Sequence, residues 1–119
     1  MPTDAFQQPI PQIQVEELAQ RIAADGNALQ LIDVREPEEL AIAQLKPFVN
    51  LPLSQFAAWS DDIQTRFDPN VETIVLCHHG VRSTQMCHWL RQQGFTQVRN
   101  VTGGIDAYSA RVDSTIPHY

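Results

Sequence analysis

The sequence predicts a single α/β domain with about five mainly parallel strands and helices on both faces of the sheet. The chain has 119 residues, which is the length of one domain. Short apolar runs alternate along it with segments whose apolar side chains recur at helical spacing, and this alternation is typical of parallel sheets. One apolar run ends directly on a cysteine followed by a glycine-containing polar loop, as expected where ligands bind at the carboxyl ends of strands.

The domain is expected to occupy residues 13–119, after a loose lead-in over residues 1–12. Three prolines stand among polar neighbours in the lead-in, a composition that favours neither helix nor strand. A helix is expected over residues 15–25, where apolar side chains at helical spacing precede a glycine and an asparagine. The apolar run at 29–34 is expected to be a buried strand, and the sequence EPEE at 36–39 the start of a second helix.

The second half of the chain continues the alternation. We expect a short strand over 48–51, a helix over 53–67, a strongly apolar strand over 73–77, a helix over 83–93 and a last short strand over 98–101. The carboxyl ends of parallel strands meet at one edge of a sheet. The cysteine that ends the 73–77 strand is therefore expected at the edge where ligands bind.

Composition and charge limit the classes of partner. Fourteen acidic against eight basic residues give a formal charge of −6, which repels nucleic acids and acidic membranes. No positively charged start precedes an apolar stretch, and no apolar run approaches the roughly 20 residues of a membrane span. We therefore expect a cytoplasmic protein with no nucleic-acid or membrane partner. Its two cysteines, Cys77 and Cys87, are too few for a disulfide framework and are expected to be free thiols.

The most informative segment is CHHGVRS at residues 77–83, named here the Cys77 loop, between a predicted strand and a predicted helix. Such a loop turns backbone N–H groups inward and the following helix adds its positive end, so the concavity favours an anion. These dipoles and Arg82 favour thiolate over thiol at Cys77, which makes the sulfur a nucleophile. Gly80 permits the positive φ of a curled loop, and Ser83 is expected to cap the helix.

The Cys77 loop resembles the active-site loop of rhodaneses, in which a cysteine, two variable residues, a glycine, one variable residue, an arginine and a serine or threonine follow one another. Three further segments resemble the family in the same order, namely LIDVREPEEL at 31–40, VNLPL at 49–53 and VTGGIDAY at 101–108. The likeness extends from Ile13 to Pro117. It implies the rhodanese-like fold for the whole domain.

The resemblance also implies an activity, which is that of a sulfurtransferase. The Cys77 thiolate would take a sulfane sulfur from a small anionic donor such as thiosulfate and pass it to cyanide, a thiol or a partner protein. The resulting persulfide would be held by the loop, without a metal or other cofactor. Its substrate-binding residues would be His78, His79, Gly80, Val81, Arg82 and Ser83.

The resemblance assigns further roles around the loop. Arg82 would shape the loop and steer anionic substrates, while Asp33 and Arg35 would support the pocket wall from the neighbouring strand end. At the position of His78 the family commonly has an arginine. The histidine weakens the positive field at neutral pH, which predicts that thiosulfate is a poor donor.

The same residues have competing structural interpretations. Cys87 is expected to be a packed structural thiol, because it lies at helical spacing from the apolar residues of its predicted helix. A zinc site would recruit the two cysteines and three nearby histidines, but adjacent loop residues rarely converge on one ion and no paired cysteine spacing is present. We therefore expect no metal at this set, which comprises Cys77, His78, His79, Cys87 and His88.

Three alternative functions share the predicted fold and the predicted cysteine. A phosphatase or arsenate reductase would surround an oxyanion with cysteine and arginine, but the loops of those enzymes are one residue longer than the four residues between Cys77 and Arg82. A sulfur-relay or regulatory binding module would use the same cysteine without free turnover. A thiol redox sensor would instead end in a disulfide or a sulfenic acid.

Overall fold

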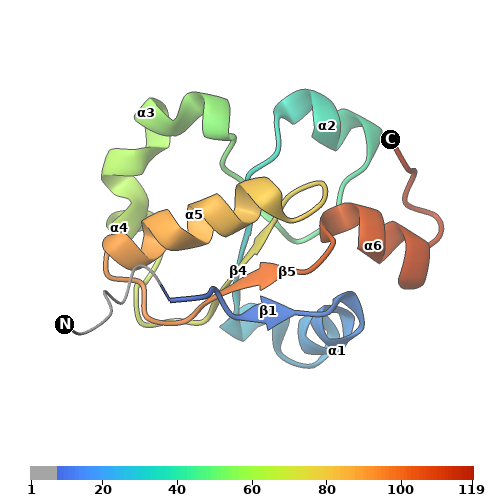
Figure 1. Ribbon diagram of the computed structural model, residues 1–119, viewed down its shortest axis with the longest axis horizontal. Helices are drawn as coiled ribbons and strands as arrows, with labels where there is room; N and C mark the ends of the chain where they lie inside the picture. Colours follow the sequence, from blue (N-terminus) through green and yellow to red (C-terminus); the bar gives the residue numbers. More distant parts are fainter. Residues whose placement is uncertain (1–7) are drawn as a thin grey trace.

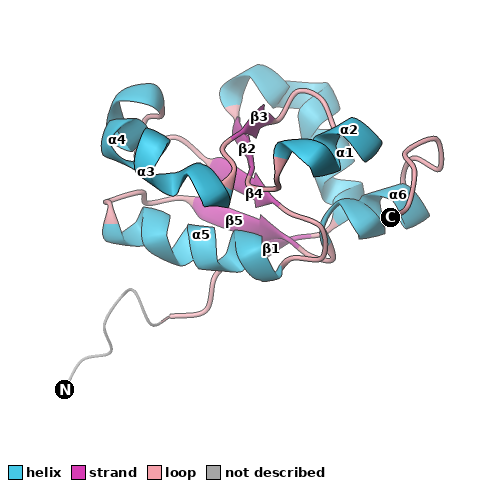
Figure 2. Ribbon diagram, turned by 90° about the horizontal axis from the view of Figure 1, so that it is seen from above, coloured by secondary structure: helices cyan, strands magenta, loops and turns pink. Residues whose placement is uncertain are grey.

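The computed structural model describes residues 8–119 and confirms the predicted α/β domain with a five-stranded sheet. The strand order is β1-β5-β4-β2-β3, and each adjacent pair is parallel. Figures 1 and 2 show β4 in the middle of the sheet, beside β5. The strands are β1 (Gln12–Ile13), β2 (Gln30–Asp33), β3 (Val49–Asn50), β4 (Thr73–Leu76) and β5 (Val98–Val101).

Helices cover both faces of the sheet, as predicted (Figure 2). One buried cluster joins the sheet to α1 and α6, and a second joins it to α3, α4 and α5. The α-helices are α1 (Val15–Asp25), α2 (Pro37–Ile42), α3 (Phe56–Trp59), α4 (Ile63–Arg66), α5 (Val81–Gln92) and α6 (Gly104–Arg111), and the 3-10 turns are η2 (Gly26–Ala28), η3 (Leu53–Gln55) and η4 (Ser60–Asp62). Within residues 8–119, no helix is both long enough and apolar enough to cross a bilayer.

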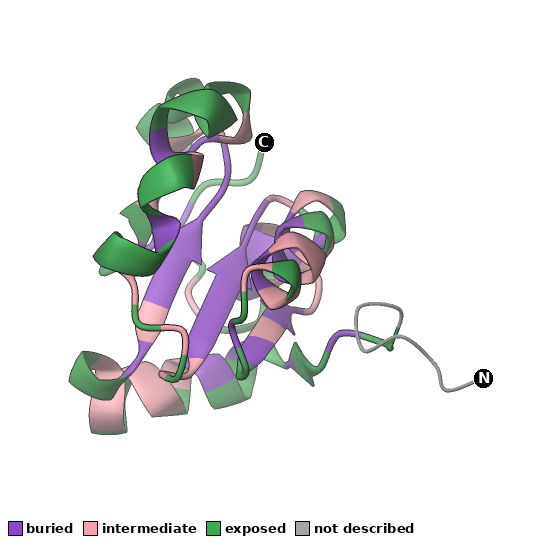
Figure 3. Cartoon of the chain, turned by 90° about the vertical axis from the view of Figure 1, so that its left-hand side faces the viewer, coloured by how far each residue is buried: buried purple, intermediate pink, exposed green. Residues whose placement is uncertain are grey.

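The central strand β4 explains the two-sided core. All four of its residues are buried, and Figure 3 shows the buried strands enclosed by helices with exposed outer faces. Side chains alternate across a strand, so Ile74 and Leu76 join the cluster under α1 and α6, while Val75 and Cys77 join the other cluster. Cys77 therefore follows the last residue of a fully buried strand.

The predicted helix over 53–67 is wrong as a single element. The segment forms four short pieces, η3, α3, η4 and α4, instead of one continuous helix. The interruption coincides with Ser60, Asp61 and Asp62, whose side chains compete with helical backbone hydrogen bonds. The Trp59 indole N–H also donates to Pro52 O at 2.9 Å, which ties the middle of the segment back to its start.

The described part of the lead-in contacts the domain. Ile10 is buried, and Gln12 pairs with Asn100 in the edge strand β1. The Arg91 guanidinium donates to the backbone carbonyls of Gln8 and Pro9. Contacts with the sheet therefore begin before residue 13. The remainder of the lead-in, residues 1–7, lies outside the described residues.

The first turn of α6 packs directly on the backbone that leaves β4. Ile105 N donates to Cys77 O at 2.9 Å, and Asp106 N donates to His78 O at 3.1 Å. These N–H groups belong to the helix start, where no intrahelical acceptor exists. Because C=O and N–H point in opposite directions across a trans peptide, the N–H groups of His78 and His79 are turned away from α6.

This packing requires a glycine at position 104. Its φ is +62°, and a Cβ atom there would lie 2.5 Å from Cys77 O and closer still to His78 O. Gly94 has a comparable φ of +95° but nothing within 4 Å of its Cβ position. A comparison of alanine substitutions at the two glycines therefore separates the cost of backbone strain from the cost of a steric overlap.

We predict that Gly104→Ala destabilises the protein much more than Gly94→Ala. Strain at positive φ costs about 1–2 kcal/mol in both variants, and only Gly104→Ala also pushes the α6 start off the Cys77 loop. Urea unfolding of the two variants and the parent measures the difference. Equal losses would mean that the close contact at residue 104 has no energetic consequence.

Candidate functional site

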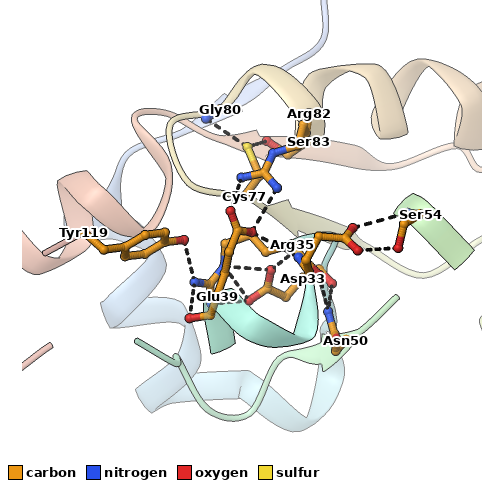
Figure 4. A network of polar contacts seen from close by, with 11 residues as sticks. Asp33, Arg35, Glu39, Asn50, Ser54, Cys77, Gly80, Arg82, Ser83 and Tyr119 are labelled. Carbon is orange, nitrogen blue, oxygen red and sulfur yellow. Dashed lines mark hydrogen bonds and ion pairs between the residues drawn. The ribbon is translucent and has the colours of Figure 1, made fainter. Parts of the chain in front are cut away.

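Cys77 lies at the carboxyl end of β4, as predicted, with its sulfur beneath the Cys77 loop (Figure 4). Its Sγ accepts a hydrogen bond from Gly80 N at 3.0 Å and lies 3.2 Å from Ser83 Oγ. The Ser83 hydroxyl also bonds to Asn100 Oδ1 on β5. The side chain is 1% exposed. The sulfur is therefore held in a small polar environment at the end of an apolar strand.

The loop backbone confirms one prediction and corrects another. Gly80 has φ +108°, the left-handed conformation predicted for it, and it precedes α5 as the N-cap residue. The expectation that Ser83 caps this helix is wrong, because α5 begins at Val81 and no side chain caps its start. Ser83 lies inside the first turn, fully buried, so its hydroxyl faces Cys77 and Asn100 instead.

Arg82 forms a bidentate ion pair with Glu39 of α2. The Arg82 Nη1 and Nη2 atoms lie 2.9 and 3.0 Å from the two Glu39 oxygens. These hydrogen bonds raise the pKa of Arg82 above its usual value, although burial opposes the rise, and the nearby Cys77 sulfur adds to it. Burial disfavours the Glu39 carboxylate, but its bonds to Arg82 and to Glu36 N lower its pKa overall. Arg82 therefore joins α5 to α2.

Asp33 and Arg35 form a buried ion pair beside this contact, with side chains 1% and 0% exposed. Arg35 Nη2 lies 2.7 Å from Asp33 Oδ2, and Asp33 Oδ1 also accepts the Arg35 backbone N–H. Burial opposes the charge on Arg35, but hydrogen bonds with Asp33 and Tyr119 raise its pKa overall. Arg35 Nη1 also lies 3.5 Å from the backbone carbonyl oxygen of Glu39, the residue whose carboxylate binds Arg82. The buried pair therefore contacts the segment that positions that carboxylate (Figure 4).

His78, His79 and Tyr119 form a stack beside the loop. The His78 ring lies 3.9 Å from the Tyr119 ring in a parallel arrangement and 3.9 Å from the His79 ring. Burial and neighbouring His79 lower the pKa of His78, so its ring is neutral near pH 7. The Tyr119 hydroxyl accepts a hydrogen bond from Arg35 Nη1 at 2.8 Å. Val81, the remaining loop residue, is 70% exposed.

The expectation of no metal at this set had assumed that the loop histidines do not converge. That assumption is wrong for part of the set, because ring nitrogens of His78 and His79 lie within 4.8 Å of each other and of an Asp106 oxygen. In the described part of the chain, neither cysteine belongs to this group. Cys87 instead lies in the buried face of α5 predicted for it, with Ser83, Met86 and Leu90.

Four residues near the loop were not found from the sequence. Glu39 had a local signal, since it belongs to a capping box at the start of α2, but that signal concerns the helix rather than Arg82. The remaining three contact the loop from sequence-distant segments, and no local pattern assigns them to the loop. They are Asn100 on β5, Asp106 on α6 and Tyr119.

We predict that an alkylating reagent modifies Cys77 and spares Cys87 in the folded protein. Burial raises the pKa of Cys87 to about 12, so at pH 8 only about one in ten thousand of these thiols is ionised. Cys77 instead has a backbone N–H and a hydroxyl at its sulfur. Intact-protein mass after iodoacetamide treatment should show one adduct, and none in Cys77→Ser. A single adduct on Cys87 would contradict the prediction.

We also predict that Glu39→Gln lowers the free energy of unfolding at pH 7, by at most about 1 kcal/mol because the ion pair is partly exposed, and that it lowers the thermal midpoint accordingly. The pKa of Glu39 is lower folded than unfolded, so its stabilisation is present above the usual value of 4.5 and is lost as pH falls through the folded value. The difference should therefore shrink in acid. Glu38→Gln, an exposed change in the same turn, is the control. A deficit that is independent of pH would exclude the ion pair as its cause.

The chain matches known proteins over most of its length. It is 48% identical over 114 residues to rhodanese-like/PpiC domain-containing protein 12, chloroplastic, of Arabidopsis thaliana, covering 94% of this chain but only 38% of that protein. It is 33% identical over 100 residues to a sulfurtransferase of Allochromatium vinosum, covering 84% of this chain and 89% of that one. Because one relative is named chloroplastic, the cytoplasmic location expected from the sequence stays a prediction.

Solved structures agree with the sequence comparison. A rhodanese-related protein from Thermoplasma volcanium superposes with a TM-score of 0.68 at 26% identity, covering 90% of this chain and 95% of that one. The family model of the rhodanese-like domain matches residues 14–111, which include every strand from β2 to β5 and the whole Cys77 loop. The chain therefore belongs to the rhodanese-like domain family.

Proposed function

We propose that this chain is a sulfurtransferase that receives a sulfane sulfur on Cys77 as a persulfide and passes it on. The observation that supports this most directly is the setting of the Cys77 sulfur, 3.0 Å from Gly80 N and 3.2 Å from Ser83 Oγ. The family membership and the relative named a sulfurtransferase support the same reaction class. The Gly80 N–H and the Ser83 hydroxyl both lie where a hydrogen bond to the sulfur would stabilise its negative charge.

The first half of the reaction forms the persulfide. The Cys77 thiolate attacks the outer sulfur of a donor such as thiosulfate, and the S–S bond of the donor breaks. Sulfite leaves with the electron pair of that bond, and a Cys77 persulfide with a negative terminal sulfur remains. No proton, oxidant or cofactor is consumed, because the nucleophile and the leaving group are both anions.

The second half returns the enzyme to its starting state. A nucleophilic acceptor, cyanide or a thiolate, attacks the terminal sulfur of the persulfide. The Cys77 thiolate leaves with the electron pair of the S–S bond and regains its hydrogen bond from Gly80 N. The product is thiocyanate or the persulfide of the acceptor, which can be a small thiol or a partner protein.

The Ser83 hydroxyl has a specific part in this exchange. It lies between Cys77 Sγ and Asn100 Oδ1, and either Ser83 or Cys77 can be the donor of their contact. In the thiol form Cys77 donates to Ser83, whereas in the thiolate form the hydroxyl hydrogen turns to the sulfur. Ser83 therefore stabilises the nucleophile and the leaving thiolate by the same hydrogen bond.

The other predicted residues act through position and charge. Arg82, held by Glu39, fixes the first turn of α5, and its charge is balanced by that carboxylate. Asp33 and Arg35 act more remotely, by supporting the α2 segment that contains Glu39. The lowered pKa of His78 leaves it neutral, which favours a weakly charged donor over thiosulfate.

Two alternatives remain open to direct test. A phosphatase or arsenate reductase would need a tetrahedral oxyanion to fit a loop with four residues between Cys77 and Arg82, which is one fewer than in those enzymes. A relay module would accept sulfur on Cys77 but release it only to a partner protein. Matched assays with an aryl phosphate, cyanide and a small thiol distinguish these outcomes from free turnover.

We predict that Cys77 gains one sulfur atom when the protein is incubated with a sulfane sulfur donor. Cys77→Ser should abolish both the mass gain and thiocyanate formation, whereas Cys87→Ser should retain most of the rate because Cys87 is a buried thiol. Ser83→Ala should slow transfer about tenfold or more, since a hydrogen bond to a charged group contributes about 1.5–3 kcal/mol. Intact-protein mass and thiocyanate release provide the two measurements.

Several results would count against the proposal. Sulfur retained in the Cys77→Ser protein would place the persulfide elsewhere. Cys77-dependent hydrolysis of an aryl phosphate that exceeds sulfur transfer would favour the phosphatase alternative. Circular dichroism of each variant controls for loss of the fold.

A further inference from the structure

Three side chains with metal-binding atoms converge beside the Cys77 loop. His78 and His79 belong to the loop, and Asp106 belongs to the first turn of α6. One ring nitrogen of each histidine and one Asp106 oxygen all lie within 4.8 Å of one another. Two imidazoles and a carboxylate form a ligand set suited to borderline divalent ions such as Zn²⁺.

The backbone brings these residues together, so their proximity does not depend on flexible side chains alone. Asp106 N donates to His78 O at 3.1 Å, directly joining the two segments that contain the ligand atoms. Gly104 makes this approach possible, because its missing Cβ would overlap the carbonyls of the loop. The three residues therefore stay close in any state in which α6 remains packed on the loop.

One nitrogen of this group lacks a hydrogen-bond partner. His78 Nε2 is buried, and across residues 8–119 it is the one buried side-chain nitrogen or oxygen atom without a partner. Buried polar groups in proteins are nearly always satisfied, and an exception calls for a bound ion or water. Stacking on Tyr119 and His79 accounts for the position of the His78 ring but provides no hydrogen bond for Nε2.

The Asp106 carboxylate is already oriented by a second histidine contact. Its Oδ1 lies 3.2 Å from His118 Nδ1, and His118 Nε2 lies 3.2 Å from Ser109 Oγ. Its other oxygen, Oδ2, lies 3.8 Å from His79 Nε2. A carboxylate that binds a metal through one oxygen is commonly held by a hydrogen bond at the other, which matches this arrangement.

We propose that His78, His79 and Asp106 form a binding site for a divalent cation of the Zn²⁺ class, with solvent completing its coordination. Bonds of about 2.0–2.2 Å place zinc ligand atoms about 3.3 Å apart, so the group must contract slightly on binding. The His79 and Asp106 side chains, 61% and 39% exposed, have the freedom to do so. The bound ion links the Cys77 loop to α6.

The test is calorimetric titration of ZnCl₂ into the Cys77→Ser protein, which removes the thiol of the Cys77 loop as a competing ligand. We expect one equivalent to bind, and we expect His79→Ala and Asp106→Asn each to weaken the affinity tenfold or more. His88→Ala, on α5, is the matched control and should leave the affinity unchanged. Zn²⁺ should also raise the thermal midpoint in Cys77→Ser and not in Asp106→Asn.

The outcomes that overturn the site are equally specific. Affinity that is the same in His79→Ala, Asp106→Asn and the parent would show that zinc binds elsewhere. A thiolate-to-metal charge-transfer band with Co²⁺ in the Cys77→Ser protein would identify Cys87 as a ligand and exclude the proposed set. These measurements follow metal binding alone, so their result does not depend on whether the protein transfers sulfur.

Discussion

The pairing of the α6 start with the carbonyls of Cys77 and His78 is the constraint on which the candidate site depends. A chain leaving a buried strand must satisfy its backbone groups at once, and here one side of the loop is satisfied by the unpaired N–H groups of a helix start. With the carbonyls bound on that side, the loop N–H groups are turned away from α6. Gly104 allows the contact by lacking a Cβ, and Gly80 closes the turn with a positive φ that brings its own N–H to the Cys77 sulfur.

Charge around the loop is arranged in pairs. Arg35 is matched by Asp33 in the interior, and Arg82 is matched by Glu39 at the surface. Removing one member of a buried pair leaves an uncompensated charge, so Asp33 and Arg35 are constrained as a unit. The Arg82–Glu39 pair also joins segments distant in sequence, because α2 provides the carboxylate that holds α5. The position of the Cys77 sulfur therefore depends on strand β4 and on the orientation of two helices.

The sequence predicted the parts of this structure that depend on local patterns. Alternation of apolar runs predicted the parallel sheet, and the Cys77 loop predicted inward backbone N–H groups, of which Gly80 N contacts the sulfur. Contacts between distant segments could not be predicted this way, since periodicity reports burial but not which segments touch. Tyr119 meets Arg35 across 84 residues of chain. Ser83 was assigned to the wrong role because a serine before an apolar run signals a cap, whereas here the helix begins two residues earlier.

The paired charges bear on how such a site would select its substrate. Both guanidinium groups beside the loop are neutralised by carboxylates, and His78 is neutral, while the whole chain has a formal charge of −6. Long-range attraction of anions is therefore weak, and stabilisation of a negative sulfur depends on short contacts from a backbone N–H and a hydroxyl. Such contacts act over about 3 Å and discriminate by size and hydrogen-bond geometry. A single terminal sulfur with one negative charge suits them better than a phosphate dianion, which would require positive charge that this loop has already committed to Glu39.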